Sequence, residues 1–582
     1  MSTPDIMENR RTRFLNRLYA RLSTRQKAAK AFVSQPEPRT IGSFSRGRQL
    51  IAGNLLFSGF LVESLDTGLW DVVSPDTAFD AERHGFGWLD DLAAVGDAAA
   101  REKAQKWLWG WIDAYGTGHG PGWTADLTGR RVIRWINHAL FLLRGQEKEQ
   151  SDVFFRVLAS QTWFLSKRWG SAAPGLPRFE ALTGLIYAGL SLEGMEALAD
   201  PAIRALSKEC VIQIDQQGGL PTRNPEELLE VFTLLTWAGA ALHEVGRDIP
   251  AGQIAAIERI APTLRTLRHA DGGLARFHGG GRGLEGRLDH ALAASEVKLR
   301  HADGLSMGYA RLSAGRTSVI VDASVPPNGT ASYNAHASTL AFELTSGRRP
   351  LIVNFGAGES FGADWRKAGR ATPSHSTLSL DGYSSSRLAT PLRGSGYEAL
   401  IDGPTHVPIE MSEMADGLQF QGGHDGYVNR FGLTHARLLD LTFDGRGMAG
   451  EDMLLAMDDV DKRQFDKALE VTKLAGVGYD IRLHIHPDVD VELDLGGAAV
   501  SMAQKSGEIW VFRHDGTTKL TLEPSVYLEK GRLKPRATKQ IVLSGHAMGY
   551  ATRIRWSLSK AQDTAIAVRD LNRDEPLSFD DD

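Results

Sequence analysis

The sequence predicts an α+β multidomain protein in which an array of helical hairpins precedes an antiparallel β-sandwich. Apolar residues recur at helical spacing from about residue 51 to residue 292, with glycine or proline between the blocks. From about residue 300 the pattern changes to short alternating segments separated by Gly, Asp and Asn turns. A chain of 582 residues is also too long for one ordinary core, so we expect two domains or more.

Residues 1–50 are the first predicted element, a basic helical segment. The stretch "NRRTRFLNRLYARLSTRQKAAKAF" lacks the apolar core and small-residue cleavage site of a secretory signal. We expect a solvated basic helix here, with a membrane-surface or partner-binding helix as the alternative. No stretch reaches the roughly eighteen apolar residues of a transmembrane helix. The cytoplasm is therefore the expected compartment.

Residues 51–298 are predicted to form the helical domain. Blocks such as "DVFFRVLASQTWFLSKRW" and "EELLEVFTLLTWAGAALHEV" carry the helical spacing. Two junctions resemble each other, "QGGLPTR" at residues 217–223 and "DGGLARF" at residues 271–277, and they start 54 residues apart. That interval suits one pair of antiparallel helices, so we expect repeated hairpins with equivalent loops on one rim.

Residues 299–570 are predicted to form the β-sandwich, and the acidic residues 571–582 a disordered tail. Segments such as "TSVIVDAS", "RLHIHPDVDVELDL" and "GEIWVFRH" show the alternation of half-buried strands.

Composition narrows the function classes. Apolar residues make up 42% of the chain and charged residues 24%, which is typical of a soluble globular protein. The net charge of -5 provides no chain-wide cationic field, so nucleic acid is not expected as a partner. Cys210 is the single cysteine, which excludes an intramolecular disulfide and a thiolate zinc cluster within the chain.

One stretch, "ASYNAHASTLAFELTSGRRPLIVNFGAG", combines a predicted strand pair with polar residues at its ends. On the simplest interpretation, His336 caps the first strand and Asn354 ends the return strand. Downstream, "WRKAGRATPSHSTLSLDG" places His375 before another alternating strand. The three side chains can therefore converge, which leaves a metal site and a catalytic edge as alternatives to a purely structural role.

The motif order here resembles the heparinase II/III family of polysaccharide lyases. The matching segments are "NAHASTLAFEL", "RPLIVNFGAG", "WRKAGRATPSHSTLSLDG", "HDGYVNRFGLTHARLL" and "RLHIHP", with a looser match in the helical half. The resemblance implies an (α/α) toroid before the sandwich and a substrate cleft between them. It also implies β-elimination on a uronate-containing polysaccharide, in which a neutral amide, His or Arg neutralises the carboxylate and a Tyr or His moves the proton.

The resemblance implies site residues on the sandwich, with two departures. The family often has His-x-His at the first strand, and this chain has Asn334 and His336. The metal-site acid on the return strand is replaced by Asn354, while the third ligand position matches as His375. Two histidines with a neutral amide make a weak zinc site, so we expect a metal-free hydrogen-bonded cluster of His336, Asn354 and His375, and no required cofactor.

The toroid departs further from the family pattern. No Tyr follows the Gly-Gly loop in "GGLPTRNPEELLEVF", and Arg178 is the polar residue nearest the expected carboxylate-neutralising position. Asn224 is a candidate replacement amide, although Asn before Pro225 is also a typical helix N-cap. Arg223 on the rim loop is the remaining candidate, because its guanidinium can hold a carboxylate.

Five further residues are substrate or catalytic candidates, each with a packing role as the alternative. Tyr333 could supply the missing phenol, and Arg370 could bind an acidic sugar. Trp123, in a Gly-rich loop, could stack on a sugar ring. His424 and Tyr427 occupy a family motif expected near the cleft.

Together these features predict a lyase-like protein that cleaves an anionic, uronate-containing poly- or oligosaccharide. The alternative is a non-catalytic carbohydrate-binding or polysaccharide-assembly protein on the same scaffold. The family would also allow a periplasmic location, and a homo-oligomer stays open.

Overall fold

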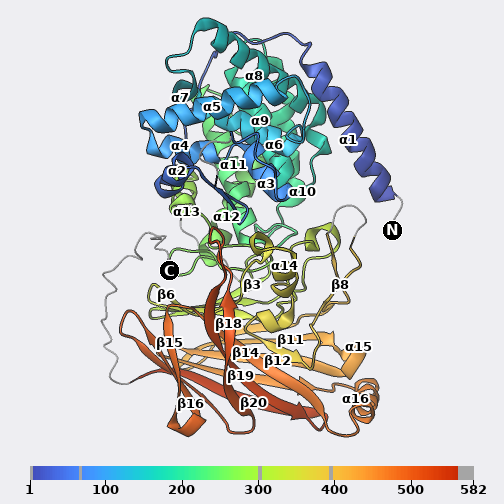
Figure 1. The fold of residues 1–582 in the computed structure, drawn as a ribbon. Coiled ribbons are helices and arrows are strands. Elements are labelled where there is room, and N and C mark those ends of the chain that lie inside the picture. Colours follow the sequence, from blue (N-terminus) through green and yellow to red (C-terminus); the bar gives the residue numbers. More distant parts are fainter. Residues whose placement is uncertain (1–3, 64–67, 299–303, 392–396, 562–582) are drawn as a thin grey trace.

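The computed structural model describes residues 4–63, 68–298, 304–391 and 397–561, and it shows a helical half stacked on an all-β half (Figure 1). The predicted acidic tail at residues 571–582 lies outside the described residues. The helices of the first half are α1 (Pro4–Ser23), α2 (Phe44–Ile51), α3 (Thr77–Gly85), α4 (Trp88–Val95), α5 (Ala98–Tyr115), α6 (Ala125–Asn137), α7 (Ala139–Leu143), α8 (Lys148–Arg168), α9 (Leu176–Ser191), α10 (Ala199–Gln213), α11 (Pro225–Glu244), α12 (Ala251–Thr266) and α13 (Arg287–Ala294). A short hairpin, β1 (Asn54–Phe57) and β2 (Phe60–Glu63), follows α2.

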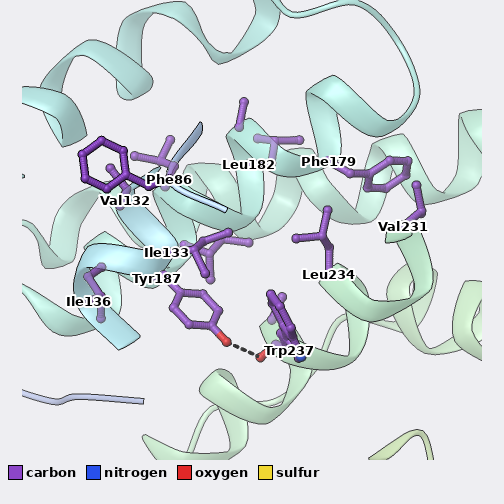
Figure 2. Packing of buried hydrophobic residues seen from close by; sticks show 14 of the residues in the cluster. Phe86, Val132, Ile133, Ile136, Phe179, Leu182, Tyr187, Val231, Leu234 and Trp237 are labelled. Carbon is purple, nitrogen blue, oxygen red and sulfur yellow. Dashed lines mark hydrogen bonds between the residues drawn. The ribbon is translucent and has the colours of Figure 1, made fainter. Parts of the chain in front are cut away.

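The helical core is built around α9, which is buried from Phe179 to Ser191. Gly129 of α6 and Gly184 of α9 let the two backbones touch, because a Cβ on Gly184 would lie 2.6 Å from the Cα of Gly129. Figure 2 shows apolar side chains of α6, α9 and α11 meeting in this core, with the Tyr187 hydroxyl donating to the Trp237 carbonyl at 3.5 Å. The helical spacing of the sequence thus corresponds to inner helices that are apolar nearly all round.

The second half is an antiparallel sandwich. Within the described residues its strands form two eight-stranded sheets, one in the order β10-β11-β12-β13-β20-β17-β16-β15 and the other in the order β18-β19-β14-β6-β5-β4-β3 with β7 paired to β14. The bounds are β3 (Tyr309–Ala314), β4 (Thr317–Asp322), β5 (Phe342–Ser346), β6 (Arg349–Val353), β7 (Leu378–Leu380), β8 (Arg387–Leu388), β9 (Leu400–Ile401), β10 (Ile409–Glu413), β11 (Gly417–Tyr427), β12 (Leu433–Thr442), β13 (Gly447–Leu455), β14 (Val477–Ile485), β15 (Val489–Asp494), β16 (Ala499–Gln504), β17 (Ile509–His514), β18 (Lys519–Tyr527), β19 (Arg536–Ala547) and β20 (Ala551–Lys560). Short helices α14 (Ala363–Ala368), α15 (Val428–Phe431) and α16 (Asp459–Val471) lie at its edges.

The two related loops of the helical half both reach the sandwich. Arg223 ends the first loop and bonds to Asp322 at the end of β4, and Arg276 in the second loop bonds through its backbone N–H to Glu343 of β5. The hairpin tip adds a third contact, since a Cβ on Gly59 would overlap the Ser360 carbonyl oxygen. The two loops, residues 217–223 and 271–277, thus lie on the same side of the helical half, the side that faces the sandwich, as predicted.

The N-terminal segment packs along the helical half. On α1, Asn16 and Ala20 are buried, and the Asn16 side chain accepts a hydrogen bond from Arg168 of α8 at 2.7 Å. The opposite face carries Phe14, Leu18 and Leu22, which are 65%, 40% and 39% exposed. Within the described residues, no helix has the length and apolar content that crossing a bilayer would need.

Candidate functional site

The stretch from Ala331 to Gly358 contains the strand pair that the sequence predicts. β5 and β6 run antiparallel in one sheet, and β7 joins the same sheet through β14. His336 lies in the loop before β5, Asn354 directly follows β6, and His375 precedes β7. The three residues therefore come from three neighbouring sheet positions, as expected.

His336 and His375 form a buried hydrogen-bonded chain. The Gly279 N–H donates to His336 Nε2 at 3.1 Å, and His375 Nδ1 donates to the Ala371 carbonyl at 2.9 Å. These two bonds fix the tautomers, so His336 Nδ1 donates to His375 Nε2 at 3.0 Å. Both nitrogens of His336 are occupied, which leaves neither free for proton transfer to a substrate.

Burial keeps both rings neutral. Loss of hydration, followed by repulsion from His375, holds the pKa of His336 well below its usual value. Burial also lowers the pKa of His375 to about 4. A neutral, fully bonded pair of this kind organises the loop before β5.

Asn354 lies beside this chain, and its own hydrogen bonds go elsewhere. Its carbonyl oxygen accepts from the Ser376 N–H at 2.8 Å, and its amide nitrogen faces Glu343 Oε1 at 3.5 Å. The expected three-residue cluster is thus corrected to a His336–His375 pair, with Asn354 joined to the neighbouring residue Ser376.

The ligand set at this position is limited for zinc. It consists of two histidines, which bond to each other at 3.0 Å, and the neutral amide of Asn354 in place of a carboxylate. Among the described residues, no group of three or more His, Cys, Asp or Glu side chains could hold a metal ion. The metal-free state of this position stays a prediction, which elemental analysis of the purified chain tests.

Arg223 is fully occupied by the sandwich. Its Nη2 bonds Asp322 at 2.7 Å, the pair is buried, and the guanidinium lies 4.7 Å from the centre of the Tyr309 ring. Its nitrogens also donate to the carbonyls of Met307, Gly308, Ser324 and Val325. Every nitrogen of the Arg223 guanidinium is thus bonded within the chain, and its catalytic or carboxylate-holding role stays a prediction that would require these bonds to break.

Arg178 and Arg370 are also bonded within the chain, and the buried Nη1 of Arg370 has no partner among the described residues. Arg178 binds Glu209 of α10 and the Ala172 carbonyl. Arg370 is 3% exposed and donates to the carbonyls of Ala335 and Ser332, each at 2.8 Å. Arg370 thus clamps the loop that carries His336, and neither arginine presents itself to an acidic sugar.

Asn224 is the N-cap of α11, as the structural alternative predicts. Its side-chain oxygen accepts from the N–H groups of Glu226 and Glu227 at 3.0 and 3.2 Å, and Pro225 is the first helical residue. Gly280 approaches this oxygen so closely that a Cβ there would lie 2.6 Å from it. The oxygen is committed to the helix, while a role of the amide in substrate binding stays a prediction.

Tyr333 and Asn334 form the lip of the loop, the first half-buried and the second exposed. Tyr333 stacks on Tyr397 with ring centres 5.4 Å apart, and Arg366 Nη2 donates to the Tyr333 carbonyl at 2.6 Å and to the Asn334 side-chain oxygen at 3.1 Å. Asn334 also lies opposite Gly279 of the helical half. Of the sandwich candidates, this pair keeps access to solvent, and its catalytic role stays a prediction.

His424 and Tyr427 belong to the sandwich interior, which corrects their expected place near the cleft. His424 and His435 are direct partners across β11 and β12, and their rings bond at 3.2 Å. His435 continues to Asp452 at 2.8 Å. The Tyr427 hydroxyl donates to the Leu378 carbonyl at 3.1 Å.

Trp123 is buried, which corrects its expected exposure to sugar. It is 3% exposed, its indole N–H donates to the Tyr115 carbonyl at 2.9 Å, and its ring packs edge-on against Phe164. A Gly-rich loop folds the indole back into the helical core.

Sequence reasoning missed a set of charge pairs inside the helical half. Arg130 of α6 binds Glu180 of α9 at 2.5 Å, and Arg134 of α6 binds Asp90 of α4 at 3.0 Å. Arg287 of α13 binds Glu230 of α11 at 2.5 Å, and Lys530 of the sandwich binds Glu226. Glu180 directly follows the motif residues "PRF", and local sequence carries no signal that it pairs with Arg130, which lies 50 residues earlier in the chain.

The toroid, the sandwich and the loop between β4 and β5 define the class of polysaccharide-lyase folds. Residues 297–557 match the family model described as Heparinase II/III-like, C-terminal. The chain is similar to FtsZ-localized protein C of Caulobacter vibrioides (strain NA1000 / CB15N), with 31% identity over 539 residues, covering 90% of this chain and 89% of that protein.

Solved structures agree on the fold. Heparinase III superposes with a TM-score of 0.69 at 13% identity, covering 93% of this chain and 88% of that chain. The heparan sulfate lyase HepC from Pedobacter heparinus gives a TM-score of 0.54 at 14% identity, covering 94% and 88%. The chain belongs to the heparinase II/III-like family.

Proposed function

We propose that this chain is a non-catalytic member of the lyase fold that assembles with FtsZ. The observation that carries the proposal is the occupation of His336 and of the three candidate arginines by groups of the protein itself. Arg178, Arg223 and Arg370 are bonded to carboxylates or carbonyls within the chain, and both nitrogens of His336 are used. β-Elimination needs a free group to neutralise the uronate carboxylate, and these candidates do not supply one.

The charges inside the helical half support the same proposal. Arg130, Arg134 and Arg287 each hold a carboxylate of a neighbouring helix. A uronate that displaced Glu180 or Asp90 would leave a buried carboxylate without its arginine. These arginines are therefore not available to a uronate carboxylate while the pairs hold.

Similarity to FtsZ-localized protein C supports FtsZ as the partner, because the match extends through both halves of the chain. The cytoplasm is the compartment we propose, with the periplasm of the lyases as the alternative.

The second candidate function is uronate lyase activity. It is favoured by Tyr333 and Asn334, which keep access to solvent on the lip of the sandwich that faces the helical half. In that case Tyr333 supplies the phenol that moves the proton, and Asn334 stabilises the developing negative charge.

A pelleting assay tests the partner. The full chain is centrifuged with FtsZ polymers, with FtsZ kept unpolymerised, and alone. Enrichment of the chain in the pellet with polymers only is the expected result. Equal recovery in all three pellets would remove FtsZ from the proposal.

A further inference from the structure

The loop between β4 and β5 contains an Asn-Gly pair, Asn328 and Gly329, which is the single Asn-Gly pair in the sequence. Both residues are exposed. Among the described residues, neither the Asn328 carboxamide nor the Gly329 N–H takes part in a hydrogen bond. The two groups that would react with each other at such a pair are therefore both free.

The reaction of this pair is intramolecular. The Gly329 backbone nitrogen attacks Cγ of Asn328, so that a bond forms between these two atoms and the bond from Cγ to Nδ2 breaks. The proton of the Gly329 nitrogen leaves with Nδ2 as ammonia, and the product is a five-membered succinimide. Water then opens the ring, its oxygen bonding to one carbonyl carbon while its proton returns to the nitrogen. Opening at Cγ gives aspartate, and opening at the backbone carbonyl gives isoaspartate.

The backbone around the pair leaves room for this attack. Asn328 is extended, with φ −124° and ψ 168°, so its Cα–C bond must rotate to bring the Gly329 nitrogen to Cγ. Gly329 has φ +55°, and a Cβ added there would meet no atom within 4 Å. Since glycine also moves among backbone conformations more freely than other residues, nothing in the surrounding structure opposes the rotation.

Asn334, later in the same loop, shows the opposite arrangement although it is also exposed. Its side-chain oxygen accepts a hydrogen bond from Arg366 at 3.1 Å. The next backbone nitrogen, that of Ala335, donates to the Ser332 carbonyl at 3.0 Å. Both reacting groups of Asn334 are thus held, which makes it an internal control for Asn328.

The free pair lies between two points at which the loop is clamped. On one side, Arg223 donates to the Val325 carbonyl at 3.0 Å. On the other, Arg370 donates to the Ser332 carbonyl at 2.8 Å. Isoaspartate would add one backbone atom between these clamps, and either product would add a negative charge. Because Tyr333 directly follows Ser332, the change would reach the lip of the sandwich.

We propose that Asn328 and Gly329 form a self-modification site, at which the folded protein converts Asn328 to aspartate and isoaspartate through a succinimide. Water is the only co-reactant. The proposal does not rest on the proposed function.

Tandem mass spectrometry of the full chain, incubated at neutral pH, tests the site. The tryptic peptide Thr317–Arg348 contains both asparagines of the loop, and a digest made before incubation corrects for conversion during digestion. We expect a mass gain of about one dalton at Asn328 and none at Asn334. An isoaspartate methyltransferase with labelled S-adenosylmethionine should then label the incubated chain.

A free peptide of residues 325–332 provides the reference rate, and the folded chain should convert at a comparable rate. Gly329→Ala should slow the conversion several-fold, because the added methyl group crowds the attacking nitrogen. Asn328→Gln should remove it, because the longer side chain would have to close a larger ring.

Three outcomes would overturn the proposal. One is equal conversion at Asn328 and Asn334. Another is a folded chain that converts far more slowly than the free peptide, because the fold would then protect the pair. The last is an unchanged rate in Gly329→Ala, which would show that the mass gain has a different origin.

Discussion

Arg223 of the helical half and Asp322 of β4 form a buried ion pair, with Nη2 and Oδ1 2.7 Å apart. The same Asp322 accepts a hydrogen bond from Ser338 at 2.6 Å and faces His278 Nε2 at 3.4 Å. One carboxylate thus connects the rim loop, the toroid and the loop that carries His336. Arg223, which the sequence predicts to bind a substrate carboxylate, instead binds the carboxylate of Asp322 in the sandwich.

The first prediction concerns this pair. Arg223→Ala leaves Asp322 buried without its cation, so we expect a loss of about 3–5 kcal/mol in the free energy of unfolding, measured by urea denaturation. Arg387→Ala breaks the exposed Arg387–Asp402 pair and should cost less than about 1 kcal/mol. Equal losses in the two variants would show that Arg223 does not join the halves.

The second prediction concerns the hairpin tip. Gly59 has φ +84° and touches Ser360, so Gly59→Ala should strain both the backbone and the contact. We expect faster amide hydrogen exchange at residues 359–361 and a loss of more than about 1 kcal/mol in stability. Gly246→Ala is the matched control, since Gly246 has φ +69° but a Cβ added there would meet no atom within 4 Å. Unchanged exchange at 359–361 in Gly59→Ala would show that this contact does not hold the two halves together.

The third prediction is a pH dependence from His84. Burial, then repulsion from Arg131 and Arg83, lowers the pKa of His84 to about 3 in the folded chain. The unfolded chain, with a pKa of about 6.5, therefore takes up a proton as pH falls below that value while the folded chain does not. Stability from this group is complete above pH ~6.5 and is lost as pH falls, by about 1 kcal/mol between pH ~7.5 and ~5.5.

His84→Gln isolates that contribution, because glutamine does not titrate. The difference in unfolding free energy between the two pH values should shrink by about 1 kcal/mol in His84→Gln. The exposed His290→Gln is the control and should leave that difference unchanged. A His84→Gln variant with the wild-type pH dependence would contradict the buried neutral state.

The fourth prediction concerns the metal. Asn354→Asp restores the family's acid, but it places a second carboxylate beside Glu343 and removes the amide donor. We expect a loss of about 2 kcal/mol in stability and no rescue by zinc chloride in thermal unfolding. Asn328→Asp, at an exposed position, is the control. Stoichiometric zinc in the purified wild-type chain, by elemental analysis, would refute this prediction.

The fold could be predicted from the sequence, because the period of the apolar residues shows which face of each helix or strand is buried. The strand pair β5–β6 follows from alternating apolar residues and the turn at "TSGRR", and the helical blocks follow from their 3.6-residue spacing. The N-cap role of Asn224 could be predicted as well, because Asn directly before Pro is a local sequence signal for a helix start.

The arrangement of the candidate site was harder to predict from the sequence, because the hydrogen-bond partners of a polar residue often lie far away in the chain. Arg178 meets Glu209 31 residues away, and Arg223 meets Asp322 99 residues away. Local sequence cannot show that these cations are already paired. His424 was partly predictable. Its pairing with His435 follows from the register of β11 and β12, and that register can be predicted once the turn between the two strands is known.

The central claim is that the scaffold no longer performs β-elimination. Its most direct test is ultraviolet absorbance of the unsaturated uronate product, with the full chain incubated with heparan, chondroitin, alginate and bacterial uronate exopolysaccharides. We predict no increase over the protein-free control with any substrate. A protein-dependent increase that Tyr333→Phe abolishes would contradict the claim and establish lyase activity.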